Sequence, residues 1–168
     1  VAIGSAAVSL PIPGADGKNV LLGTEFADHY DQIGEKVVVI GGGQIGCEHA
    51  LEMADDGKKV MIIEAAEELA LSAGFLPRSN LLQHLDEHPN IEYMTSTRCD
   101  AIEEDGVVIG EEKIECDTVI MAVGMKSRSE EVSQFFGITP RTYYVGDCRR
   151  VATVNEAVND AYFIAANL

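Results

Sequence analysis

Positive charge is scarce in this chain of 168 residues, which carries 12 Lys and Arg against 28 Asp and Glu and has a formal net charge of −16. Such a chain offers no basic surface for the phosphate backbone of a nucleic acid or for an anionic membrane. Long apolar runs are also missing, because no stretch approaches the roughly 18 residues of a membrane-spanning helix. We therefore predict a cytoplasmic protein with neither nucleic acid nor membrane as a partner.

Cysteine is sparse as well, and the four residues of this type are Cys47, Cys99, Cys116 and Cys148. Their spacing matches no metal or redox motif, and four are too few for a disulfide framework, so each is expected to be a small buried side chain. His84 and His88 stand four apart, as zinc ligands on a helix can, but no third ligand is evident and a solvated helix face is favoured. We predict no metal site.

The hydrophobic fraction of 46% is enough for the core of one domain, or of one domain and part of another. The chain begins in an apolar stretch at residues 1–5 without a methionine, from which we expect a piece of a longer protein.

The clearest predicted unit is a strand, a helix and a second strand. Residues 37–40 form a β-branched run, as in a parallel strand buried on both faces. Apolar residues at helical spacing predict a helix over residues 44–56 that ends at Gly57, and residues 59–63 form the second strand. A right-handed crossover would place the two strands side by side and parallel.

An antiparallel β-meander is predicted between residues 99 and 114, where Asp105-Gly106 is a hairpin signal between short apolar runs. The other predicted elements are a helix over residues 79–87, strands over 91–94, 117–123 and 142–145, and a helix over 153–167. Together these elements predict an α/β, Rossmann-like three-layer fold with a central parallel sheet.

Three glycines at the start of the predicted helix carry the strongest chemical signal. Gly41, Gly43 and Gly46 have the GxGxxG spacing, in which the first permits a sharp turn, the second lets a pyrophosphate approach and the third lets the helix pack closely. The helix N-terminus, with Gln44 and Ile45, then offers unpaired N–H groups to the phosphates. The pattern predicts a dinucleotide site, with an ordinary glycine turn as the alternative.

Glu64 ends the second strand, 23 positions after Gly41, where an acidic side chain can reach the adenosine ribose. A carboxylate there would repel the 2′-phosphate of NADP(H), whose sites usually contain an arginine. Ala65 and Ala66 follow instead, and no arginine occurs before Arg78. We therefore expect NAD(H) as the cofactor.

Residues 37–48 resemble the NAD(P)H-binding domain of flavoproteins with two dinucleotide-binding domains, in particular the 2,4-dienoyl-CoA reductase and NADH:flavin oxidoreductase family, which is related to old yellow enzyme. Residues 2–5 and 11–14 resemble the crossing from the FAD domain into the NAD domain. Residues 117–124 resemble the strand that closes the NAD domain, and residues 144–148 resemble the second FAD motif.

This resemblance implies three parts of the chain. Residues 1–20 would be the trailing piece of an FAD domain with its crossover, residues 21–126 an NAD(H)-binding domain, and residues 127–168 the returning piece of the FAD domain. The three-layer fold would thus carry partial FAD-domain segments at both ends. The first glycine motif of the FAD domain, the FMN-binding barrel and the cysteines of a 4Fe–4S cluster would lie outside this chain.

The resemblance also implies roles for single residues. Gly124 would lie against the NAD, and Glu48 would lie near the nicotinamide and the flavin edge, with a plain helix-surface carboxylate as the alternative. Gly146 and Asp147 match the FAD motif and would be remnants of a site that this chain cannot complete. No catalytic residue is expected in this segment.

In the intact protein NADH would pass a hydride to FAD, and electrons would run through the iron–sulfur centre to FMN, which reduces an activated double bond. The partners would be the nicotinamide dinucleotide and the FAD and FMN domains of the same chain, and this piece alone would bind cofactor without turnover. The alternatives are the reductase part of an NADH oxidase or disulfide-reductase-type flavoprotein, a complete small dehydrogenase, and a non-catalytic NADH sensor.

Overall fold

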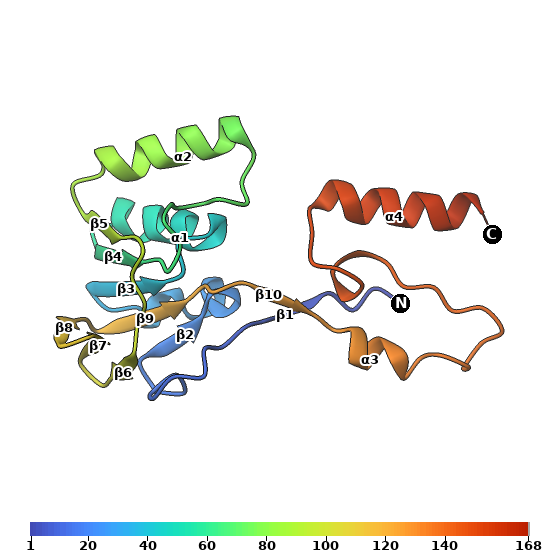
Figure 1. Ribbon diagram of the computed structural model, residues 1–168, viewed down its shortest axis with the longest axis horizontal. Coiled ribbons are helices and arrows are strands. Elements are labelled where there is room, and N and C mark those ends of the chain that lie inside the picture. The colour runs from blue at the N-terminus through green and yellow to red at the C-terminus, as the bar shows by residue number, and fades with distance from the viewer. Residues whose placement is uncertain (168) are drawn as a thin grey trace. The chain divides into compact units, whose positions relative to one another are not determined.

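The computed structural model describes residues 1–167, and the chain divides into two compact units (Figure 1). Unit 1 contains residues 1–8 together with the chain from residue 125 onward, and unit 2 contains residues 9–124. Within residues 1–167, no helix has the length and apolar character needed to cross a membrane.

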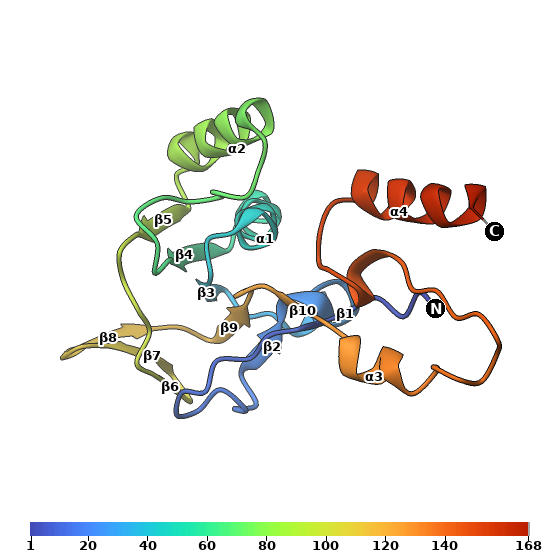
Figure 2. The ribbon, with the colours of Figure 1, turned by 45° about the vertical axis from the view of Figure 1, so that its right-hand side comes forward.

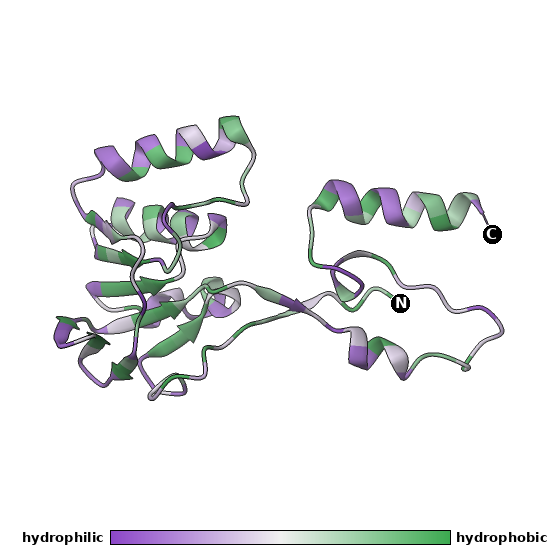
Figure 3. Cartoon of the chain, in the orientation of Figure 1, coloured by the Kyte–Doolittle hydropathy of each residue, from purple (hydrophilic) through white to green (hydrophobic). Residues whose placement is uncertain are grey.

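The centre of unit 2 is a parallel sheet of five strands in the order β2, β9, β3, β4 and β5. These strands are β2 (Val20–Leu22), β3 (Lys36–Ile40), β4 (Lys59–Ile63), β5 (Ile91–Met94) and β9 (Thr118–Met121). Figure 3 colours them mostly green, for hydrophobic residues. In β3 the four residues after Lys36 are buried, as expected for a strand that is covered on both faces.

Two helices, α1 (Gln44–Asp55) and α2 (Phe75–Glu87), cover one face of this sheet (Figures 1 and 2). Short 3₁₀ turns η1 (Gly23–Glu25) and η2 (Ala27–Gln32) follow β2. Val39 and Ile62 from the sheet pack in one core with Met53 of α1 and Leu85 of α2. Helix α2 begins earlier than predicted, because Pro77 falls in its first turn, where a proline costs no hydrogen bond.

An antiparallel meander covers the other face of the sheet (Figure 2). Its strands are β6 (Ala101–Glu103), β7 (Gly106–Ile109) and β8 (Glu112–Glu115). Val38 and Ile63 from the sheet pack against Ile102 and Val107 of the meander. Unit 2 therefore has three layers, namely helices, parallel sheet and antiparallel meander, and the predicted α/β Rossmann-like fold class is confirmed.

Unit 1 is built from β1 (Ser5–Ala7), antiparallel to β10 (Met125–Ser127), with α3 (Ser129–Ser133), the 3₁₀ turn η3 (Gly146–Cys148) and α4 (Val154–Ala166). The predicted strand over residues 142–145 is wrong. The amino group of Val1 donates to the Tyr143 carbonyl at 2.7 Å and Val145 N–H donates to the Val1 carbonyl at 3.1 Å. Because both of these bonds involve the single residue Val1, no ladder of hydrogen bonds between two strands forms.

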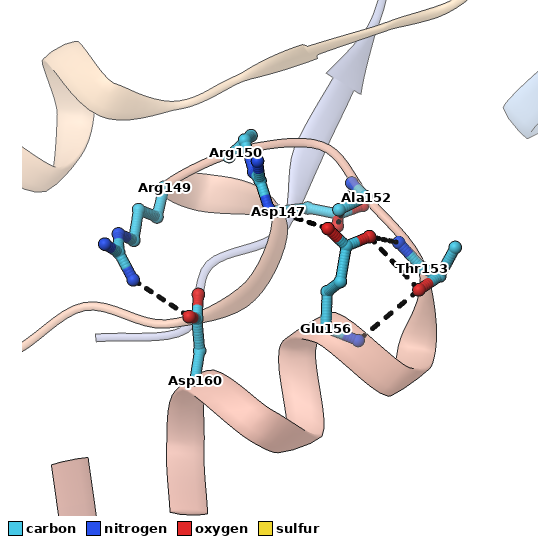
Figure 4. A network of polar contacts seen from close by, with 7 residues as sticks. All are labelled: Asp147, Arg149, Arg150, Ala152, Thr153, Glu156 and Asp160. Atoms are coloured by element: carbon cyan, nitrogen blue, oxygen red, sulfur yellow. Dashed lines mark hydrogen bonds and ion pairs between the residues drawn. The ribbon is translucent and has the colours of Figure 1, made fainter. Parts of the chain in front are cut away.

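Helix α4 begins with a reciprocal cap (Figure 4). The Glu156 N–H donates to Thr153 Oγ1 at 3.4 Å, and the Thr153 N–H donates to Glu156 Oε2 at 3.1 Å. Hydrogen bonds from the backbone and hydroxyl of Thr153 lower the pKa of Glu156 below its usual value. Arg149 pairs with Asp160 and Arg150 with Glu156, but these exposed ion pairs add little stability.

Replacing Thr153 with alanine should weaken the first turn of α4 by about 1 kcal/mol, the usual contribution of an N-cap side chain. Amide hydrogen exchange of residues 154–157 should then become about fivefold faster. Asn155→Ala is the control, because that residue lies on α4 outside the cap. Equal exchange in both variants would show that the cap does not hold this turn.

Candidate functional site

A pocket of about 510 Å³ lies in unit 2 at the carboxyl edge of the parallel sheet. Ile40 and Ile63, the last residues of β3 and β4, line it, as does Ala122 directly after β9. Open α/β sheets bind their ligands outside the carboxyl ends of the strands. The pocket is therefore the candidate functional site of this unit.

Two of the motif glycines are required by the protein itself. Gly41 has φ +104°, and a Cβ there would lie 2.5 Å from the Ala122 carbonyl oxygen. A Cβ at Gly46 would lie 2.0 Å from the Gly41 carbonyl oxygen. A side chain at Gly46 would push α1 away from the glycine loop, and a side chain at Gly41 would push that loop away from the segment after β9.

Gly43 differs from both, because nothing in the protein requires glycine there. Its φ of −68° suits any residue, and an added Cβ would meet no atom within 4 Å. The open space next to Gly43 is therefore available to a ligand that approaches the backbone closely.

The N-terminus of α1 next to Gly43 carries unpaired donors. Gly43 is the N-cap residue, no side chain caps the helix and its first turn contains no acidic residue. The first bond of the helix runs from Cys47 N–H to the Gly43 carbonyl at 3.0 Å, so the N–H groups of Gln44, Ile45 and Gly46 have no partner within the helix. Such an end attracts anions, phosphate above all.

The Glu64 carboxylate is fixed at the wall of the pocket by two backbone donors. Gly42 N–H donates to its Oε2 at 2.6 Å, and Ala66 N–H donates to its Oε1 at 2.7 Å. A carboxylate has about four acceptor sites, so two remain for a ligand hydroxyl. Sequence position alone did not indicate that Glu64 also orients the glycine loop.

The loop after Glu64 also binds the Gly42 carbonyl. Ala70 N–H donates to the Gly42 carbonyl at 2.7 Å, and Ala70 itself has φ +51°, a left-handed conformation that costs energy for alanine. A Cβ on Gly42 would lie 2.3 Å from a methyl carbon of Leu69. Each of the two peptide groups that flank Gly42 is therefore held by a hydrogen bond, one through the Gly42 N–H and one through the Gly42 carbonyl.

The structure brings Gly41, Gly43, Glu64 and Gly124 together around the pocket, and Gly124 has φ +111°. The other residues predicted to bind NAD lie outside the pocket lining, on the adjoining first turns of α1. Ile45 is 46% exposed there, and the Gln44 side-chain amide donates to the Glu48 carboxylate at 2.8 Å.

The two residues predicted to contact FAD lie in unit 1. Gly146 has φ +69° and begins η3. Asp147 accepts a hydrogen bond from the Ala152 N–H at 3.3 Å (Figure 4) and another from the Ser5 hydroxyl at 3.2 Å. Its carboxylate thus ties the turn before α4 to β1 within this unit.

Among the pocket residues that sequence reasoning missed are Thr97, Arg98 and Cys99. They follow β5, the strand next to β4 in the sheet, and their position at the carboxyl end of a strand is the signal that could have found them.

Arg78, the first arginine after Glu64 in the sequence, binds residues of the loop before α2. Its Nε donates to the Leu69 carbonyl at 2.9 Å, and its Nη2 pairs with Glu68 at 2.6 Å.

All four cysteines are buried free thiols, as predicted. Burial raises the pKa of Cys47 to about 12, which disfavours the reactive thiolate at neutral pH, and its Sγ donates to the Gly42 carbonyl at 3.4 Å. His88, which the sequence analysis considered as a zinc ligand, has its Nε2 atom 3.5 Å from an Asp55 carboxylate oxygen. Residues 1–167 contain no cluster of three or more His, Cys, Asp or Glu side chains that could hold a metal ion.

Residues 1–161 match the sequence family described as pyridine nucleotide-disulphide oxidoreductase. The chain is 31% identical to cinnamate reductase of Clostridium sporogenes, across the whole chain and 26% of that relative. It is also 31% identical to bilirubin reductase of Mediterraneibacter gnavus, across the whole chain and 27% of that relative. The solved complex of 2-naphthoyl-CoA reductase with 2-naphthoyl-CoA superposes with a TM-score of 0.87 at 28% identity, covering 96% of this chain and 25% of that one.

Proposed function

Since this chain belongs to the pyridine nucleotide-disulphide oxidoreductase family, we propose that it is the NAD(H)-binding segment of a flavin-dependent oxidoreductase. The family implies binding of FAD and NAD(P)H. The chain spans about a quarter of the length of the curated relatives it matches, 26% and 27% in two of them. The observation that carries the proposal is the pocket of unit 2, which combines an uncapped helix N-terminus with a fixed carboxylate.

The residues of this chain would bind and orient the dinucleotide. The N–H groups at the start of α1 would donate to the pyrophosphate, which can approach because Gly43 has no side chain. Glu64 would accept from the adenosine ribose hydroxyls, and Gly124 would lie against the nicotinamide half. Bound NADH supplies a hydride for FAD. The protein contributes by positioning the cofactor and excluding water, so no acid or base residue is required in this segment.

The same proposal assigns the parts of the chain. Residues 21–126 would form the NAD(H)-binding domain, and residues 1–20 and 127–168 would belong to an FAD domain, with Gly146 and Asp147 as its flavin-contacting residues. The compact unit of residues 9–124 supports this division in its main part, although residues 9–20 belong to the same unit as the proposed NAD(H)-binding domain. Glu48, exposed on α1, would face the nicotinamide end.

For the acceptor we propose an activated carbon–carbon double bond, as in the 2,4-dienoyl-CoA reductase and old yellow enzyme-related proteins, with FMN and a 4Fe–4S cluster elsewhere in the intact protein. The names cinnamate reductase and 2-naphthoyl-CoA reductase among its relatives support an unsaturated organic acceptor. An NADH oxidase or disulfide reductase would differ in its acceptor and would use the same nucleotide site.

Calorimetric titration of the 168-residue chain with NADH and NADPH tests the nucleotide assignment. The wild type should prefer NADH. Glu64→Gln should bind NADH about tenfold more weakly, because the charged acceptor for the ribose is lost and one of the backbone donors of Gly42 and Ala66 loses its acceptor. The preference over NADPH should shrink because the repelling charge is gone.

Glu67→Gln provides the matched control, since it removes the same charge from an exposed residue in the same loop. It should bind like the wild type. Failure of the wild type to bind either nucleotide would refute the proposed function, whereas unchanged NADH binding by Glu64→Gln would remove only Glu64 from the site.

A further inference from the structure

Arg98 is held at the pocket by its neighbours in the chain. Thr97 N–H donates to the Glu64 carbonyl at 2.9 Å, and Ser96 N–H donates to the Ala66 carbonyl at 2.7 Å. Ser96 has φ +51°, an uncommon conformation that turns the chain at this point. The segment after β5 is thereby fixed against the segment after β4, and Arg98 lines the same pocket as Glu64.

The Arg98 side chain is exposed, and within residues 1–167 it forms no ion pair and no hydrogen bond. The other arginine of unit 2, Arg78, is bound to the Leu69 carbonyl and to Glu68. A free guanidinium in a strongly acidic chain, on a residue that lines the same pocket as Glu64, is thus available to a ligand.

The order of strands in the sheet indicates which part of a dinucleotide this guanidinium meets. From β3 through β4 to β5, the pocket offers first the open N-terminus of α1, then Glu64 and then Arg98. A dinucleotide with its pyrophosphate at the helix and its ribose at Glu64 has only the adenine left to place at the end of β5. A guanidinium plane stacks well on such a ring.

We propose that Arg98 forms the adenine subsite of this pocket, with its guanidinium packed on the face of the ring. The inference rests on the proposed function and deepens it. Because the Glu64 carboxylate would repel a 2′-phosphate, we assign Arg98 to the base rather than to a phosphate. It is therefore a specificity-determining residue for the adenosine half of the ligand, which the sequence did not reveal.

Titration of the 168-residue chain and its variants with NADH and with ADP-ribose tests this assignment. Arg98→Ala should bind both ligands about tenfold more weakly, the usual loss when a base-stacking side chain is removed. Arg98→Lys keeps the charge without the planar group and should recover only part of this loss. Lys59→Ala removes the same charge from the opposite end of β4 and should bind both ligands like the wild type.

The possible outcomes separate this inference from the proposed function. If the wild type binds NADH and Arg98→Ala binds it equally well, the adenine subsite is overturned and the proposed function stands. Full binding by Arg98→Lys would overturn the stacked geometry, since charge alone would then suffice. If the wild type binds neither NADH nor ADP-ribose, the proposed function itself fails, and the subsite with it.

Discussion

Replacing Gly46 with alanine is expected to lower the free energy of unfolding of unit 2 by about 3 kcal/mol, at the upper end of the usual cost of overpacking. The added Cβ would lie 2.0 Å from the Gly41 carbonyl oxygen and 3.3 Å from Ala122 Cβ. A backbone oxygen cannot rotate away as a flexible side chain can, so α1 must shift from β3. This cost exceeds the gain of about 1 kcal/mol in helix propensity that alanine normally brings.

Urea unfolding followed by circular dichroism measures this change. Gly43→Ala is the matched control, because it adds the same methyl group three residues earlier, where no atom lies within 4 Å. Its stability should fall by less than about 1 kcal/mol, the difference between glycine and alanine at an N-cap. Equal stability of the two variants would disprove the close packing of α1 on the glycine loop.

Gly43→Ala should instead lower the affinity for NADH by about 100-fold or more. Its methyl group would occupy the space through which a pyrophosphate reaches the N–H groups at the start of α1. Each hydrogen bond to a charged group is worth about 1.5 to 3 kcal/mol, so the loss of two accounts for a change of this size. Binding and stability should therefore separate, with Gly43 needed for the ligand and Gly46 for the fold.

Calorimetric titration with NADH checks this expectation, and Gly74→Ala is its control. Gly74 is the N-cap residue of α2 with φ −62°, close to the −68° of Gly43, and its added Cβ would lie 3.8 Å from the nearest atom. This variant should bind NADH like the wild type. Wild-type affinity in Gly43→Ala would place the pyrophosphate away from α1 and contradict the proposed binding mode.

The sequence alone determined the framework of unit 2. The β-branched run before Gly41 and the apolar stripe after it dictate strand and helix through local chain geometry, and the Asp105-Gly106 turn dictates the meander. The dinucleotide hypothesis rested on the spacing of the glycines and on Glu64 at the end of the second strand. These signals could be read from the sequence because they all lie within one βαβ unit.

Tertiary structure alone decided which distant residues meet. Arg98 reaches the pocket because β5 pairs with β4, and that pairing depends on long-range packing that no local pattern encodes. Arg78, which is nearer to Glu64 in sequence, is turned away by its bonds to the loop and to Glu68. Residues 142–145 form no strand because a strand needs a partner of matching length, and within residues 1–167 their backbone pairs across the chain with the backbone of Val1 alone.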